Sequence, residues 1–150
     1  MSAVTYTAIL SALKAIFEAD ARTSGARVFV EEDPQFGLSD AGKAIVLTMM
    51  NRSPTSGQPL AAGKRTRYMA RIGVWSVGFD MASFNDACVK RDALLGQVEL
   101  VLMDNRTVSD NVTASQLEGG DFMTVRNPGE NVFCAMAETI VSAEVVAINS

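Results

Sequence analysis

The chain has 150 residues, of which 48% are hydrophobic, and a formal net charge of −4. This length suits one domain, over residues 1–150, that buries roughly 70% of the surface of its unfolded chain, so it needs no disulfide or metal to stay folded. The acidic balance argues against a dedicated nucleic-acid binder, whose affinity rests mainly on basic contacts to phosphates.

The N-terminal third predicts a helix followed by two strands. Ile9, Leu13 and Phe17 follow the three-four spacing of an amphipathic helix over residues 6–20. Because Lys14 and Glu18 interrupt its apolar run, this segment fits neither a signal peptide nor a membrane span. We therefore expect a soluble protein made inside a cell. Residues 27–31 and 44–50 have the β-branched, apolar composition of short strands.

A long connection follows the second strand, at residues 51–66. It holds Pro54, Gly57, Pro59 and Gly63. A structureless connection of this length is usually functional or disordered. We expect a flexible loop here.

The segment 65–103 predicts a strand that passes directly into a capped helix. Both faces of the strand are largely apolar, with Met69, Trp75, Val77 and Phe79 on one and Tyr68, Ala70, Ile72 and Val74 on the other. A strand of this kind is expected to be covered on both sides. The Ser83 hydroxyl and the Asp86 carboxylate form a capping pattern, which predicts a helix from Ser83 to about Asp104.

The last third predicts an irregular region at about 105–130, with a modest strand at 122–126, and then a strand from Val132 to Ile148. The final strand is longer than usual, so we expect it to bend, to contain a bulge or to extend past the sheet. Together these elements predict an α+β fold, in which a mainly antiparallel or mixed sheet of about four to five strands packs with two helices.

Several stretches resemble catalytic or metal-binding motifs, but each lacks a residue or a spacing that the motif requires. Five residues separate Gly57 from Gly63 where a phosphate loop has four, and Arg65 stands in place of the magnesium-binding hydroxyl. The chain has no histidine to serve as the base of a serine hydrolase. Cys88 and Cys134 are too few for a zinc site, and we expect both to be free thiols in apolar surroundings. The sequence therefore predicts no enzyme, no cofactor and no metal.

The charged candidates concern contacts with partners. The basic group comprises Lys64, Arg65, Arg67 and Arg71. Arg67 and Arg71 project from the same face of a regular strand. This group predicts either an interface with acidic neighbours or phosphates, or a solvated start of the strand. Glu138 and Glu144 share a face of the last strand, where they either meet solvent or line a channel.

The order of elements resembles that of the tail terminator proteins of tailed bacteriophages. The resemblance rests on the helix at 6–20, the strand Arg27-Val28-Phe29-Val30, the strand at 44–50, the strand at 68–79 that runs into the helix opened by Ser83-Phe84-Asn85-Asp86, and the long strand from Val132. The resemblance covers most of the chain. It rests on the order of the elements and on their general composition, since the family has no short signature motif. The region 107–131 lies outside it.

The resemblance implies a structural virion protein assembled in the host cytoplasm. It implies a ring, commonly a hexamer, that caps the tail tube, ends its polymerisation and offers a surface for head joining. The partners would be further copies of the chain, the tail tube protein and a connector or neck protein, with DNA passing through the lumen without specific binding and no membrane. On this basis Arg52, Lys64, Arg65, Arg67 and Arg71 are candidate contacts to subunits or tube, and Glu138 and Glu144 are candidate lumen residues.

Two alternatives use the same elements. A neck or head-completion connector would have a similar size and a similar sequence composition. A small ligand-binding or enzymatic domain is the other, since fold alone does not fix function. A deep pocket with converging polar groups would favour the latter.

Overall fold

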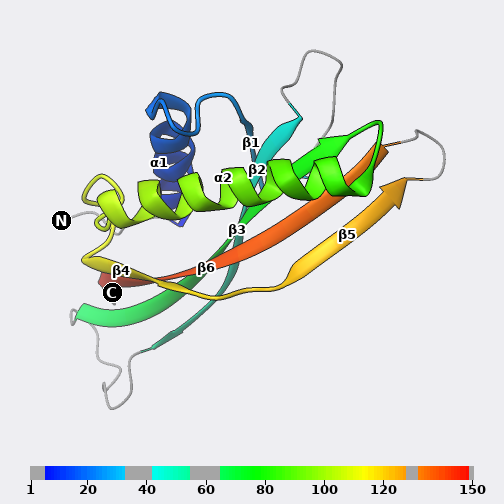
Figure 1. The fold of residues 1–150 in the computed structure, drawn as a ribbon. Coiled ribbons are helices and arrows are strands. Elements are labelled where there is room, and N and C mark those ends of the chain that lie inside the picture. The colour runs from blue at the N-terminus through cyan, green and yellow to red at the C-terminus, as the bar shows by residue number, and fades with distance from the viewer. Residues whose placement is uncertain (1–5, 33–41, 55–64, 128–131, 149–150) are drawn as a thin grey trace.

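The computed structural model describes residues 6–32, 42–54, 65–127 and 132–148. The elements are α1 (Tyr6–Ala19), β1 (Arg27–Val30), β2 (Lys43–Pro54), β3 (Arg65–Asp80), α2 (Phe84–Asp104), β4 (Ala114–Glu118), β5 (Phe122–Asn127) and β6 (Val132–Ile148). The predicted α+β class is confirmed, with two helices and one mixed sheet (Figure 1).

The sheet has the strand order β1-β2-β3-β6-β4, and β5 also pairs with β6. The pair β1–β2 is parallel and the other pairs are antiparallel. β3 pairs with β6 along all of its 16 residues, from Arg65 opposite Ile148 to Asp80 opposite Phe133. On its other side β6 is shared by β4 and β5, which is why the final strand is so long.

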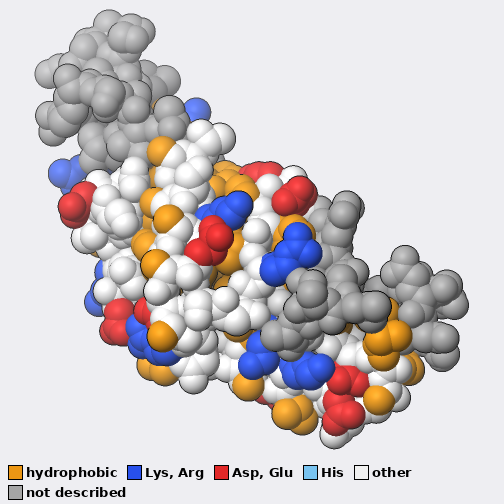
Figure 2. Space-filling view, turned by 90° about the horizontal axis from the view of Figure 1, so that it is seen from above, with side chains coloured by type: hydrophobic (Ala, Val, Ile, Leu, Met, Phe, Trp, Pro, Cys, Tyr) orange, Lys and Arg blue, Asp and Glu red, His pale blue; other side chains and the backbone are white. Residues whose placement is uncertain are grey.

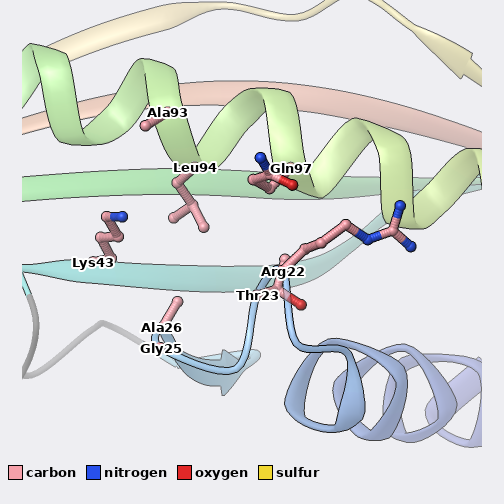
Figure 3. Close-up of a pocket in the computed structure, with 8 residues that line it drawn as sticks. All are labelled: Arg22, Thr23, Gly25, Ala26, Lys43, Ala93, Leu94 and Gln97. Atoms are coloured by element: carbon pink, nitrogen blue, oxygen red, sulfur yellow. The ribbon is translucent and has the colours of Figure 1, made fainter.

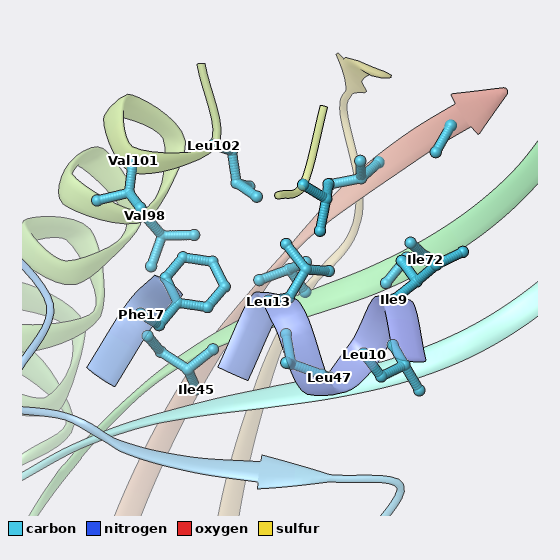
Figure 4. Packing of buried hydrophobic residues seen from close by; sticks show 14 of the residues in the cluster. Ile9, Leu10, Leu13, Phe17, Ile45, Leu47, Ile72, Val98, Val101 and Leu102 are labelled. Carbon is cyan, nitrogen blue, oxygen red and sulfur yellow. The ribbon is translucent and has the colours of Figure 1, made fainter. Parts of the chain in front are cut away.

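Both helices pack on the same face of the sheet. The fully buried side chains of α1 are Ile9, Leu10, Leu13 and Phe17. They join buried residues of α2 and the sheet in one core, part of which is shown in Figure 4. The residues that join them are Ile45, Leu47, Ala70, Ile72, Val74, Leu94, Val98, Val101, Leu102, Val141, Ala143 and Val145. Burying a side chain such as Phe17 stabilises the fold by roughly 1.5–3 kcal/mol. The three-four spacing on α1 therefore fixes it to the sheet.

The opposite face of the sheet, called here the helix-free face, is buried only toward one end. A smaller cluster there comprises Phe29, Ala44, Val46, Val77, Phe79 and Cys134. Toward the other end the same face of β3 carries Arg71 and Arg67. The prediction that β3 is covered on both sides therefore holds for the end at Val77 and Phe79 and not for the whole strand.

The start of α2 confirms the predicted cap. The backbone N–H of Asp86 donates to the Ser83 hydroxyl at 3.1 Å. The N–H groups of Ala82 and Ser83 donate to the Asp80 carboxylate, at 2.7 and 3.4 Å. The Asp80 carboxylate thus accepts from backbone donors at the helix start, which is the role expected of the Asp86 carboxylate. The first turn of α2 then lies directly on β3, because a side chain at Gly78 would overlap backbone atoms of Ala87 and Arg91.

Two predicted boundaries change. β2 continues to Pro54 and β3 begins at Arg65, so both ends of the segment expected to be a loop at 51–66 are strands, and residues 55–64 lie outside the described residues. The strand expected at 122–126 is confirmed as β5. β4 was not predicted and lies in the region expected to be irregular.

Candidate interface surfaces

Arg67 and Arg71 lie on the helix-free face, as the alternation of β3 predicts. Ala70 and Ile72 beside them point into the core under the helices. The Arg71 guanidinium lies 3.0 Å from the Glu118 carboxylate of β4, and the Arg67 guanidinium lies 3.5 Å from the Glu144 carboxylate of β6. Both ion pairs are about half exposed, so each adds little to stability. They do hold the two guanidinium groups against acidic partners of the same chain.

Arg71 is more constrained than a surface arginine. Its Nε is buried and, within the described residues, has no hydrogen-bond partner. An unsatisfied buried donor costs roughly 1–3 kcal/mol. The guanidinium is thus fixed across β6 toward β4 and is poorly placed to reach a phosphate.

Glu138 and Glu144 share the helix-free face, as predicted. Their partners across the β3–β6 ladder are Trp75 and Met69, which lie on that face. The Glu138 carboxylate lies over the backbone of Gly73, 3.2 Å from where a Cβ of that glycine would be. Glu144 is engaged by Arg67. These two carboxylates are therefore brought to one surface but are in different electrostatic settings.

Arg52 belongs to the other side of the sheet. It stands opposite Ala70 in β2–β3 pairing, and its guanidinium lies 4.3 Å from the ring centre of Tyr68 and 5.2 Å from that of Tyr6. It donates to the Tyr6 hydroxyl at 2.9 Å, and this hydrogen bond raises the pKa of Arg52 above its usual value. Arg52 thus joins the start of α1 to the sheet and does not form one surface with Arg67.

The other basic candidates are not brought to this surface by the described structure. Lys64 lies outside the described residues, and Arg65 begins β3 with its side chain outside them. Among the described candidates, Arg52 lies on one face of the sheet and Arg67 and Arg71 lie on the other, so these three do not form one patch. The acidic partners Glu118 and Glu144 were missed as ion-pair partners, because they come from strands far away in the sequence and no local motif marks them.

The two edges of the sheet expose backbone over several residues. β1 pairs only with residues 44–47 of β2. Just beyond, Glu31 has a positive φ of 54°, its N–H donates to the Leu47 carbonyl, and its carboxylate accepts from the Met49 N–H, at 2.9 Å each. Among the described residues, 50–54 of β2 have no strand on the side away from β3, and β4 and β5 have none on the side away from β6. Unpaired edges of this kind can accept a strand of another chain.

A hollow of about 350 Å³ lies between the turn after α1, the start of β2 and the middle of α2. Figure 3 shows Lys43 and Arg22 on its lining, with Gln97 and Leu94 from α2. Arg22 is held by Asp20 and Asp104 at 2.9 Å each. Hydrogen bonds from Arg22 lower the pKa of Asp20 to about 2. The hollow therefore contains a satisfied salt-bridge cluster rather than converging catalytic groups.

The described part of the chain contains no group of three or more Asp, Glu, Cys or His side chains able to hold a metal ion. Within the same residues, neither helix is long and apolar enough to cross a bilayer.

The comparisons with known proteins give distant structural similarities and no family. No protein-family model matches the chain, and no curated protein matches it. Among solved structures, a chain from the virion of a native gene transfer agent particle is similar, with 12% identity and a TM-score of 0.41 over 90% of this chain and 93% of that chain. At that TM-score the two folds are only loosely alike.

Proposed function

We propose that the chain is a structural protein of a phage-like virion, and specifically a tail terminator that forms a ring on the end of the tail tube. The observation that carries the proposal is the combination of an element order like that of this family with one sheet whose two edges differ and, among the described residues, pair with no further strand. The gene transfer agent chain is too dissimilar to add support.

The edges explain how a ring would close. Among the described residues, one edge is formed by β1 and, beyond it, by residues 50–54 of β2, and the other by β4 and β5. Because the edges differ, contact between copies is heterologous, and heterologous contacts that close by rotation give a ring. Strand addition at such an edge supplies backbone hydrogen bonds without a dedicated side-chain site.

The helix-free face suits a lumen through which DNA passes without specific binding. Arg67 and Arg71 are partnered by Glu144 and Glu118, so their guanidinium groups are not free to neutralise phosphates. Glu138 adds a carboxylate to the same face. We place this face toward the ring axis and the helices toward the outside.

Met50 gives a mutational test of the edge. It lies in β2 at the register shift between Met49 and Asn51, and its side chain is 41% exposed. A lysine on an edge strand opposes strand addition, so Met50→Lys is expected to abolish sedimentation with tail tubes while the subunit stays folded. The matched control is Met81→Lys, at a side chain 62% exposed in the turn before α2, which should still sediment. Equal sedimentation of both variants would contradict the edge model.

Imaging the assembled particle tests the terminator role itself. The proposal predicts a ring of this chain between the tail tube and the connector. A position within the head or at the connector, away from the tube, would instead identify a neck or head-completion protein.

A further inference from the structure

The outer strands β1 and β5 determine whether the two edges of the sheet can pair with each other in neighbouring copies. β1 is the outermost strand of one edge, and β5 lies beside β6 on the other (Figure 1). Among the described residues, neither strand has a partner on its outer side. The fit between the edges depends on where their free backbone groups point and on which face of the sheet the attached side chains lie.

Val28 and Val30 direct the free backbone groups of β1 outward. The Glu31 N–H donates to the Leu47 carbonyl of β2 at 2.9 Å, which makes Glu31 and, two residues earlier, Phe29 the positions bonded to β2. The N–H and C=O groups of Val28 and Val30 therefore point away from β2. Their side chains pack against the core under the helices, so they lie on the helix side of the sheet.

Phe122 and Thr124 direct the free backbone groups of β5 outward. The Glu138 N–H of β6 donates to the Asp121 carbonyl at 2.8 Å, so Asp121 and every second residue after it are bonded to β6. The N–H and C=O groups of Phe122 and Thr124 therefore point away from β6. Phe122 lies on the helix side, because the Arg91 guanidinium of α2 stands 5.0 Å from its ring centre, and Thr124 shares that side.

The two sets of free backbone groups match in direction and in face. β1 and β5 run in opposite directions in the sheet, so copies rotated about an axis along the strands present them antiparallel. In an antiparallel pair, residues that exchange hydrogen bonds lie opposite each other, with side chains on the same face. The outward residues of both strands belong to the helix side. Their pairing therefore keeps the helices of every copy on one face of a continuous sheet, as a closed ring requires.

The exposed apolar side chains of β5 gain partners in this pairing. Phe122 is 67% exposed and Met123 is 48% exposed. Figure 2 looks onto the helix side, where hydrophobic side chains lie at the surface among charged ones of both signs. With Val30 of the next copy opposite Phe122, its Phe29 comes opposite Met123 on the helix-free face. Such aromatic and β-branched pairs stabilise neighbouring strands.

We propose that β5 of one copy pairs antiparallel with β1 of the next, so that the sheet continues from subunit to subunit around the ring. The register places Val28 opposite Thr124 and Val30 opposite Phe122. This inference rests on the proposed function and names the strands that join its subunits.

Proline at an outward position of β5 tests the pairing. The Thr124 N–H points away from β6, so Thr124→Pro removes a hydrogen bond to the next copy and none to β6. The variant should unfold at nearly the urea concentration of the unmodified protein, but electron microscopy should show no rings of it on tail tubes. Thr124→Val keeps the N–H and should form rings. Rings of folded Thr124→Pro at the unmodified level would overturn the proposal.

Cross-linking identifies the partner strand without relying on a disruptive variant. Arg27→Cys and Met123→Cys place thiols at exposed positions of β1 and β5 on the same face. Mixed on tail tubes and treated with a short bismaleimide, the two variants should give covalent dimers. Either variant alone, or Arg27→Cys mixed with Met103→Cys at the far end of α2, should give only the background from Cys88.

The outcomes separate this inference from the terminator role. Tubes that carry rings of both variants without the covalent dimers would overturn the pairing of β1 with β5 and leave the terminator role standing. Protein that never joins tail tubes would contradict the terminator role, and with it this inference.

Discussion

Replacing Gly78 with alanine is predicted to destabilise the fold strongly. The added Cβ would overlap the carbonyl oxygen of Ala87 and the amide nitrogen of Arg91, and would lie 3.0 Å from Cβ of Lys90. The overlapping atoms belong to the helix backbone, so no side-chain rotation relieves the clash and α2 must move away from β3. Overpacking costs roughly 1–3 kcal/mol, and the upper end of that range applies because the opposing atoms are backbone.

Gly96→Ala is the matched control for this prediction. It adds the same methyl group to the same region, but nothing lies within 4 Å of it, so the variant should gain about 1 kcal/mol from helix propensity. Urea unfolding of both variants, followed by far-ultraviolet circular dichroism at equal protein concentration, measures the two free energies. An unfolding free energy for Gly78→Ala within about 0.5 kcal/mol of the unmodified protein would refute the close approach of α2 to β3.

Three further predictions follow from strained or perturbed residues. Asp110→Gly should raise the free energy of unfolding by about 1 kcal/mol, because Asp110 has a φ of 64° that glycine adopts without strain; urea unfolding would show an unchanged midpoint if this is wrong. Asp20→Asn should lower the urea midpoint at pH 7 but not at pH 2: the pKa of Asp20 is depressed to about 2 by Arg22, so its stabilisation is present above about pH 4 and is lost as pH falls through 2. A midpoint difference independent of pH would contradict this. Cys88, partly exposed, should react with a thiol reagent before Cys134, whose pKa burial raises to about 11; mass mapping that finds Cys134 modified first would refute the assignment.

Local signals predicted the helices and the central strand because their determinants lie close together in the sequence. Ser83 caps α2 through a residue three positions away, and Ile9, Leu13 and Phe17 set the buried face of α1. The C-terminal end of β2 was missed for the opposite reason. Arg52 and Pro54 have a loop-like composition, yet they lie opposite residues of β3, and strand formation depends strongly on such pairing.

The candidate site, too, could be predicted from the sequence only where local signals determine it. The alternation of β3 correctly placed Arg67 and Arg71 on one face. Their ion pairs with Glu144 and Glu118 depend on the order of β3, β6 and β4 in the sheet, which no short sequence pattern encodes. Arg52 was grouped with them by charge alone, whereas strand pairing places it on the opposite side, against Tyr6.

The most direct test of the proposed function is the length of the phage tails that are made when the gene for this chain is deleted. A terminator that caps the tube predicts tails of excessive and variable length that do not join heads, with normal length restored when the protein is supplied from a plasmid. Tails of normal, uniform length in the deletion would contradict the proposal.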